Sequence, residues 1–97
     1  MIWGVIWSDE SKKDLKKFEK KTRRIIVDKV EGIKDGPHRF IKKLRDVPLY
    51  TFQIGAYRAI LDLKSGKLII FVVMVSDRGH VYDRLWDSLF FMIPKPG

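Results

Sequence analysis

The stretch from Leu68 to Val75 constrains the fold more than any other part of the chain. It holds eight consecutive apolar residues, and several of them are β-branched. A run of this length and composition suits a strand better than a helix. Such a continuous apolar strand is typical of a central position with cover on both faces of the sheet. The sequence therefore predicts a sheet built around residues 68–75.

Two further segments just before this run alternate in polarity. Residues 48–54 place aromatic and aliphatic side chains at every second position, and residues 57–63 repeat the alternation after a turn at Gly55-Ala56. A second turn lies at residues 64–67. Period-two alternation between short turns is typical of antiparallel strands. We expect a meander of three strands over residues 48–75.

The N-terminal part predicts one strand and two helices. Residues 2–7 are apolar apart from one glycine, and Ser8 with the acidic residues after it is a good helix start. Apolar residues then recur at helical spacing up to the stop at Asp35-Gly36-Pro37. A single rod of about 27 residues would span roughly 40 Å, longer than a domain of this size is wide. We therefore expect a helix hairpin with its break near Lys21-Thr22.

The remaining segments complete a single domain. Residues 37–47 predict a polar connection in which Phe40, Ile41 and Leu44 anchor to the core. Within an apolar tail over residues 84–97, Leu85 to Ile93 shows helical spacing before two prolines, which predicts a short amphipathic helix. The expected fold is α+β over residues 1–97: an N-terminal strand, a helix hairpin, a three-strand meander completing a four-stranded sheet, and a short C-terminal helix.

Charge and composition narrow the function. Lys and Arg number 20 against 12 for Asp and Glu, which gives a net charge of +8 in 97 residues. A strongly basic domain favours an anionic macromolecule as partner. The chain has no cysteine and two histidines, so we expect no metal and no cofactor. It shows neither a basic leader nor an apolar run of about 18 residues, which predicts a soluble cytoplasmic protein without membrane contact.

Lysines are concentrated on the two predicted helices and before the meander. The candidate RNA-binding residues are Lys12, Lys13, Lys16, Lys17, Lys20, Lys21, Lys42 and Lys43. Like charges four residues apart on a helix repel each other, and a polyanion relieves that repulsion. The simpler interpretation is a solvated helix face that binds nothing.

Two arginines are candidates for phosphate chemistry. Arg58 lies early in a predicted strand and Arg78 directly follows the central one, so the meander could bring them to one face. Two guanidinium groups on one phosphate would bind it and polarise it. The alternative is that each arginine pairs with a nearby acid such as Asp62 or Asp77.

Tyr82 and His80 are the other candidate catalytic residues. A tyrosine beside cations can stack on a base or take part in proton transfer from a hydroxyl group, and a histidine can exchange a proton near neutral pH. The alternative for Tyr82 is packing at the edge of the sheet with a solvated hydroxyl group. The alternative for His80 is simple exposure.

The ordered motifs resemble the RelE/ParE toxin superfamily, and more closely the RelE-type mRNA interferases. The resemblance rests on the pair Lys43-Leu44, on Gly55-Ala56-Tyr57-Arg58 at the turn into a strand, and on Arg78 four residues before Tyr82. The order of elements is also similar over about residues 2–85. Each motif is short, but the ordered set is specific.

The resemblance implies a toxin that enters the ribosomal A site and cuts mRNA without a metal, by 2′-hydroxyl attack on the adjacent phosphate. It implies that Arg58 and Arg78 stabilise the charge growing on the phosphate and that Tyr82 orients or activates the attacking hydroxyl. It also implies a RelB-like antitoxin as partner, with the ribosome and mRNA, and a free toxin that is monomeric.

Two positions depart from the family pattern. Thr51 and Gln53 stand where many relatives place arginine or lysine. His80, Lys42 or Lys43 could then supply the acid that protonates the leaving oxygen. Two other functions stay open: a ParE-like inhibitor of DNA gyrase that cleaves nothing, and a catalytically weak member that only binds RNA.

Overall fold

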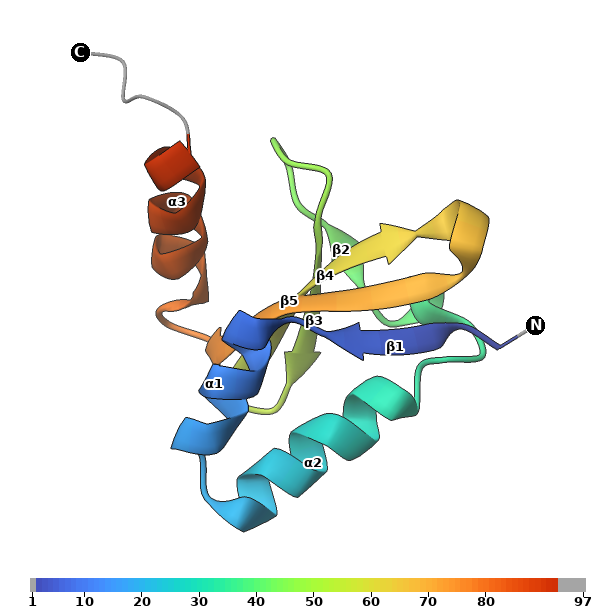
Figure 1. Ribbon diagram of the computed structural model, residues 1–97, viewed down its shortest axis with the longest axis horizontal. Helices are drawn as coiled ribbons and strands as arrows, with labels where there is room; N and C mark the ends of the chain where they lie inside the picture. Colours follow the sequence, from blue (N-terminus) through green and yellow to red (C-terminus); the bar gives the residue numbers. More distant parts are fainter. Residues whose placement is uncertain (1, 93–97) are drawn as a thin grey trace.

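The computed structural model describes residues 2–92, with side chains described as far as Asp87. The elements, in chain order, are β1 (Gly4–Trp7), α1 (Asp9–Lys17), α2 (Lys20–Glu31), β2 (Lys42–Lys43), β3 (Tyr50–Ile54), β4 (Tyr57–Lys64), β5 (Ile69–Asp77) and α3 (Val81–Met92). Short 3₁₀ turns precede β2 and join β4 to β5. Figure 1 shows these elements as one sheet with three helices around it. The predicted α+β class is confirmed.

The sheet has five strands in the order β1-β5-β4-β3-β2. β1 runs parallel to β5, and the other neighbours are antiparallel. The predicted central strand therefore does lie inside the sheet, between β1 and β4. The prediction of four strands was wrong, because β2 forms within the predicted connection 37–47. A strand of two residues is too short to show alternation, and it forms only because the edge of β3 offers hydrogen-bonding partners.

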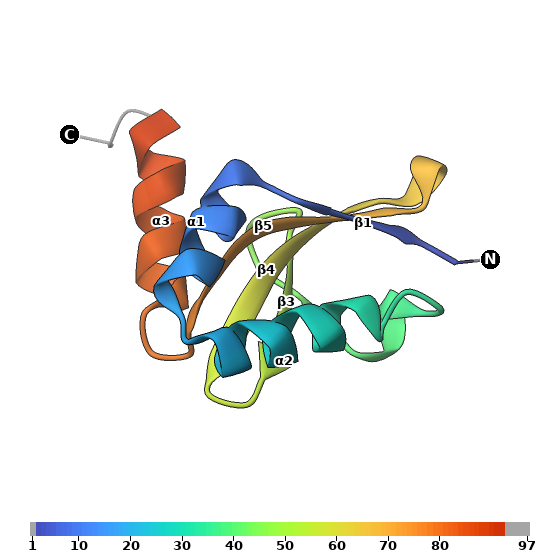
Figure 2. The same ribbon diagram turned by 60° about the horizontal axis from the view of Figure 1, so that its bottom comes forward.

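The two faces of the sheet are covered unequally. Helices α1 and α2 cover one face, and the main core there includes Ile26, Val30, Leu61 and Val72, all fully buried. α3 stands over one end of the opposite face (Figure 2) and buries a smaller cluster of Ile60, Met74, Val81 and Leu85. The rest of that second face is only partly covered, unlike the cover on both faces that the sequence predicted for the central strand.

A β-bulge in β5 explains how two neighbouring stretches of this strand serve different clusters. Leu61 pairs with Val72 and Ile60 with Met74, which leaves Val73 as the extra residue. The extra residue resets the alternation, so that Val72 and Val75 both face the main core while Met74 faces α3.

The helix boundaries differ from the sequence prediction at two places. Ser8 caps α1 as expected, accepting a hydrogen bond from the Ser11 backbone at 3.0 Å. The break in the hairpin falls at Phe18, earlier than the predicted Lys21-Thr22. Phe18 is extended, and its ring packs 4.9 Å from the ring of Tyr57, centroid to centroid. Tertiary packing of one aromatic side chain therefore sets the position of the break.

Helix α3 begins at Val81 rather than at the predicted Leu85. Val81 is fully buried in the second cluster, so the apolar face starts one turn earlier than the sequence pattern suggested. The end of the predicted segment, from Ile93, lies outside the described residues. The earlier start places Tyr82 in the first turn of a helix. No helix within residues 2–92 has the length and apolar character needed to cross a membrane.

Beside the second half of β5, side chains form the backbone hydrogen bonds that a neighbouring strand would otherwise form. β1 ends at its pairing with Val72, and beyond that point Ser8 donates to the Val73 carbonyl at 2.7 Å. Asp14 then accepts from the Val75 backbone N–H at 2.9 Å, and Arg84 donates to the Val75 carbonyl at 3.1 Å. Asp14 and Arg84 also pair with each other at 3.0 Å. These contacts tie α1, β5 and α3 together.

Candidate functional site

Strand register arranges the residues of the less covered sheet face in two neighbouring rows, which contain most of its polar side chains. One row across the strands is Lys42, Thr51, Ile60 and Met74, and the next is Gln53, Arg58 and Ser76. Residues directly opposite each other in a sheet share a face, so Thr51 and Arg58 are diagonal neighbours on the same surface. This surface belongs to the sheet face on which α3 packs, through Val81 and Leu85.

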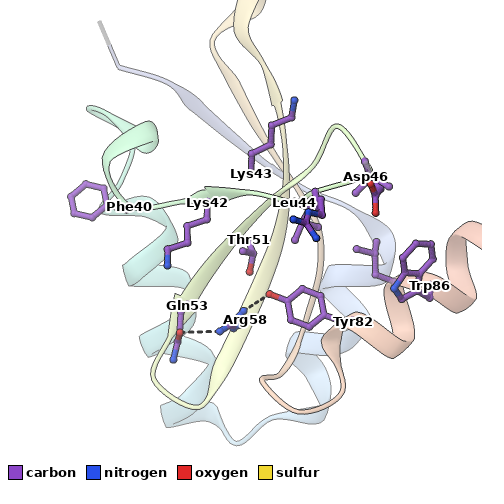
Figure 3. Close-up of a pocket in the computed structure, with 13 residues that line it drawn as sticks. Phe40, Lys42, Lys43, Leu44, Asp46, Thr51, Gln53, Arg58, Tyr82 and Trp86 are labelled. Carbon is purple, nitrogen blue, oxygen red and sulfur yellow. Dashed lines mark hydrogen bonds between the residues drawn. The ribbon is translucent and has the colours of Figure 1, made fainter.

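A cavity of about 460 Å³ lies over these rows. Its floor includes Thr51, Gln53 and Arg58, one wall is α3 with Tyr82 and Trp86, and the other wall is the segment 40–47 (Figure 3). The basic lining residues are Lys42, Lys43, Arg45 and Arg58, against one acidic residue, Asp46. The cavity therefore combines positive charge with aromatic walls, which suits a phosphate-bearing ligand.

Arg58 is held at the centre of the cavity by two side chains. Its Nη1 donates to the hydroxyl oxygen of Tyr82, and its Nη2 donates to the Gln53 side-chain oxygen at 3.3 Å. The guanidinium carbon also lies 5.4 Å from the centroid of the Tyr82 ring, within range of a cation–π interaction. Arg58 forms no ion pair with any carboxylate among the described residues, so its charge remains available to an anionic ligand.

Two polar atoms at this floor have no partner. The Thr51 hydroxyl oxygen and the Arg58 Nε are both buried, and neither has a hydrogen-bond partner among the described residues. Buried polar groups in native proteins are nearly always paired, so an unpaired one often marks a ligand site or a bound water.

Arg78 and His80 lie in the turn between β5 and α3, outside the residues that line the cavity. Arg78 is exposed, and its backbone N–H donates to the Ala56 carbonyl at 2.8 Å. His80 pairs with Asp77 at 2.6 Å. That hydrogen bond and the charge of its partner raise the pKa of His80 and lower the pKa of Asp77. The structure thus brings Arg58 and Tyr82 into contact, whereas Arg78 and His80 lie in the turn before α3 and do not line the cavity.

The predicted RNA-binding lysines divide into two groups. Lys42 and Lys43 of β2 line the cavity. The six lysines of the helices are all exposed on α1 and α2 and do not line it: Lys12, Lys13, Lys16, Lys17, Lys20 and Lys21. The chain therefore has a basic helix surface as well as a basic cavity.

Three residues at the site were missed from the sequence or assigned another role. Gln53 was noted only as a departure from a family pattern, yet it holds Arg58. Phe40 was predicted to anchor the core but is 53% exposed at the cavity wall, because β2 turns the chain along the sheet edge. Trp86, within the predicted apolar helix, is 47% exposed on the opposite wall. The sequence could not predict which α3 positions are exposed, because the buried face is set by the start of the helix at Val81.

These features define a class of protein: a small basic α+β domain whose half-open sheet carries a cavity lined by basic and aromatic side chains. The family model described as the ParE toxin of type II toxin–antitoxin systems, parDE, matches residues 5–82. The chain therefore belongs to the ParE toxin family, within the RelE/ParE superfamily, and is a toxin of a type II toxin–antitoxin system. The resemblance found in the sequence motifs is confirmed at this level.

Solved structures share the fold at low sequence identity. The RelBE2 toxin–antitoxin complex of Mycobacterium tuberculosis is 18% identical, with a TM-score of 0.76 over 80% of this chain and 100% of that one. A mutant of the E. coli toxin RelE in the free state is 19% identical, with a TM-score of 0.75 over 96% and 99%. The archaeal RelE–RelB complex from Pyrococcus horikoshii OT3 is 22% identical, with a TM-score of 0.69 over 84% and 100%. No curated protein matches the chain significantly.

Proposed function

We propose that this toxin is a ribosome-dependent endoribonuclease that cleaves mRNA through its own side chains. The observation that carries the proposal is the contact between Arg58 and Tyr82 on the floor of a basic cavity. A guanidinium group and a phenol side by side match the two needs of RNA cleavage, which are charge stabilisation at the phosphate and orientation of the attacking hydroxyl.

The proposed reaction uses the 2′-hydroxyl of the nucleotide before the cut. Its oxygen bonds to the adjacent phosphorus as the hydroxyl proton passes to solvent water, and the bond from phosphorus to the following 5′-oxygen breaks as that oxygen takes up a proton. The products are a 2′,3′-cyclic phosphate and a 5′-hydroxyl end, so no water and no oxidant is consumed. Arg58 stabilises the additional negative charge on the phosphate oxygens, and Tyr82 holds the attacking hydroxyl in line.

The leaving oxygen needs a proton, and Lys42 is the best placed of the three candidates. Lys42 is in register with Thr51, one of the two positions where relatives place a cation, so its ammonium group projects from the same face of the sheet. His80 is paired with Asp77 in the turn before α3 and does not line the cavity. Arg78 has no side-chain partner among the described residues and is proposed to close on the phosphate from the turn.

The proposal includes two classes of partner. Five of the similar structures are complexes of RelE-type toxins with RelB-type antitoxins or an antitoxin peptide, which supports a RelB-like antitoxin for this chain. The exposed lysines of α1 and α2 are proposed to contact ribosomal RNA through its phosphates, without sequence preference.

A second candidate is inhibition of DNA gyrase by binding alone. The observation that favours it is that the matching family model is the ParE toxin itself. Because one fold can carry different functions, the family match does not decide between the two. A third, weaker possibility from the sequence, RNA binding without cleavage, depends on the neutral residues Thr51 and Gln53.

The test is to express the toxin and map the 5′ ends of translated messages by primer extension. We expect growth arrest with cuts inside messages that are being translated. Arg58→Ala should abolish the cuts, and Tyr82→Phe, which keeps the ring, should reduce them by about 10²-fold or more. Arg24→Ala, an exposed arginine on α2, is the matched control. DNA breaks without mRNA cuts would instead support the gyrase inhibitor.

A further inference from the structure

We infer that the Thr51 hydroxyl is a ligand-binding group that, with Arg58 Nε, forms a two-donor seat for one phosphodiester oxyanion on the cavity floor. The inference rests on the proposed function, since it names the ligand chemistry of the same site. It concerns a position at which the family pattern predicts a cation and this chain has a neutral side chain.

The first support is the burial of an unpaired hydroxyl group. Thr51 is 8% exposed, lines the cavity, and its hydroxyl oxygen has no hydrogen-bond partner among the described residues. A valine would fill the same volume without leaving a polar atom unpaired. The hydroxyl therefore lowers the stability of the free fold, and a ligand that bonds to it would offset that penalty.

The second support is the chemistry of the nearby unpaired atom. Arg58 Nε also lacks a partner, and a guanidinium nitrogen can only donate. Thr51 and Arg58 are diagonal neighbours on the same sheet face, a relation that places the Cα atoms of two paired strands about 7–8 Å apart. Lys42 stands beside Thr51 on the next strand. Donors from three neighbouring strands that line one cavity select a ligand with several acceptor oxygens and negative charge, which describes a phosphate group.

The third support is that the charge of the guanidinium group is not neutralised by its hydrogen-bond partners. Gln53 and Tyr82 each accept one hydrogen bond from Arg58 (Figure 3), and neither neutralises its charge. Both unpaired atoms are shielded from solvent as the side chains stand. An oxyanion would reach them when the flexible Arg58 side chain shifts from Gln53 and Tyr82 towards the incoming phosphate.

The test compares Thr51→Val with Thr51→Ser in the full chain, because valine keeps the shape and serine keeps the hydroxyl. The first measurement is the melting temperature without ligand. The second is the affinity for a short single-stranded RNA with 2′-O-methyl sugars, which cannot be cleaved. The same sequence as DNA, and inorganic phosphate followed by NMR, are further probes. Thr22→Val on α2, outside the cavity, is the matched control.

We expect Thr51→Val to raise the melting temperature by about 4 °C or more and to weaken binding of all three probes by about tenfold. Thr51→Ser should keep most of the affinity, and Thr22→Val should leave it unchanged. Opposite signs for stability and binding are the signature of a binding group, because a structural hydroxyl would lower both when removed.

Two results would overturn the inference. One is unchanged affinity in Thr51→Val. The other is a loss confined to the 2′-O-methyl RNA, with binding of the DNA and of inorganic phosphate unchanged, which would assign the hydroxyl to a ribose oxygen rather than to phosphate. Binding and stability do not depend on cleavage, so the seat and the proposed nuclease can fail separately. Wild-type protein that never cuts messages, with weaker binding in Thr51→Val, refutes only the nuclease. Wild-type cleavage with unchanged binding in Thr51→Val refutes only the seat.

Discussion

Asp14 allows the sharpest prediction about stability, because its carboxylate serves two elements at once. Its side chain is 4% exposed and accepts from the Val75 backbone N–H while pairing with Arg84. Replacing Asp14 with alanine removes the only acceptor that the structure assigns to this N–H within the described residues. It also leaves Arg84 with Glu10 as its one carboxylate partner among the described residues, besides the Val75 carbonyl to which it donates.

The size of the effect follows from the two losses. A buried backbone donor left unpaired costs about 1–3 kcal/mol. Truncating one member of a buried ion pair costs about 3–5 kcal/mol, and the lower end applies here because the Arg84 side chain is 32% exposed. The losses overlap, so we expect Asp14→Ala to lower the free energy of unfolding by about 3 kcal/mol, a large part of the 5–15 kcal/mol typical of a domain.

The assay is equilibrium unfolding in urea, followed by circular dichroism, with five variants, one of which is the single variant Arg84→Met that the double-mutant cycle needs. Asp14→Asn keeps an acceptor for Val75 and should lose about 1–2 kcal/mol, whereas Glu10→Ala removes a solvent-exposed partner and should lose less than about 1 kcal/mol. The double variant of Asp14→Ala with Arg84→Met should show a coupling of about 1–3 kcal/mol. Equal losses for Asp14→Ala and Glu10→Ala would refute the reasoning, since burial would then make no difference.

Three other predictions concern charge and backbone. His80→Gln should lower the melting temperature most near pH 5 and less at pH 8 or pH 3. The ion pair needs a protonated His80 and an ionised Asp77, so its contribution is lost as pH rises through the raised pKa of His80 and as pH falls through the lowered pKa of Asp77. Gly55→Ala should lower the free energy of unfolding in urea by about 1–2 kcal/mol, because Gly55 has a φ of +59°, although a Cβ there would meet no neighbouring atom. Gly66→Ala should leave the free energy of unfolding nearly unchanged, because Gly66 has neither a positive φ nor a close neighbour. Replacing all lysines of α1 with alanine should weaken RNA binding and flatten its salt dependence; an unchanged slope would exclude them from the interface.

Much of the fold was predictable because its signals are local. The apolar run at residues 68–75, the alternation at 48–63 and the Ser8 cap each depend on near neighbours in the chain, and each is present in the structure. The helix break was misplaced because Phe18 leaves the helix to pack on Tyr57, a contact with a distant strand. β2 was missed because its existence depends on the free edge of β3.

The cavity contains some of the residues that the sequence singled out, but their arrangement was not predictable. Arg58 and Tyr82 were singled out from their types and spacing, and the structure joins them. Strand register and the start of α3 decide three further features that the sequence did not show. These are the exposure of Phe40, the contact of Gln53 with Arg58, and the position of Arg78 in the turn outside the cavity lining. The assignment of catalytic roles to these residues remains a prediction for the experiments above.

The amino-acid sequence alone determined that this protein is a basic α+β domain with the ordered motifs of its superfamily, because periodicity, charge and turn residues act over short distances along the chain. Only the tertiary structure decided that Thr51 lies diagonal to Arg58 on the open sheet face and that Asp14 reaches Val75 and Arg84. Strand register and helix docking set these positions, and both arise from the packing of segments far apart in the chain.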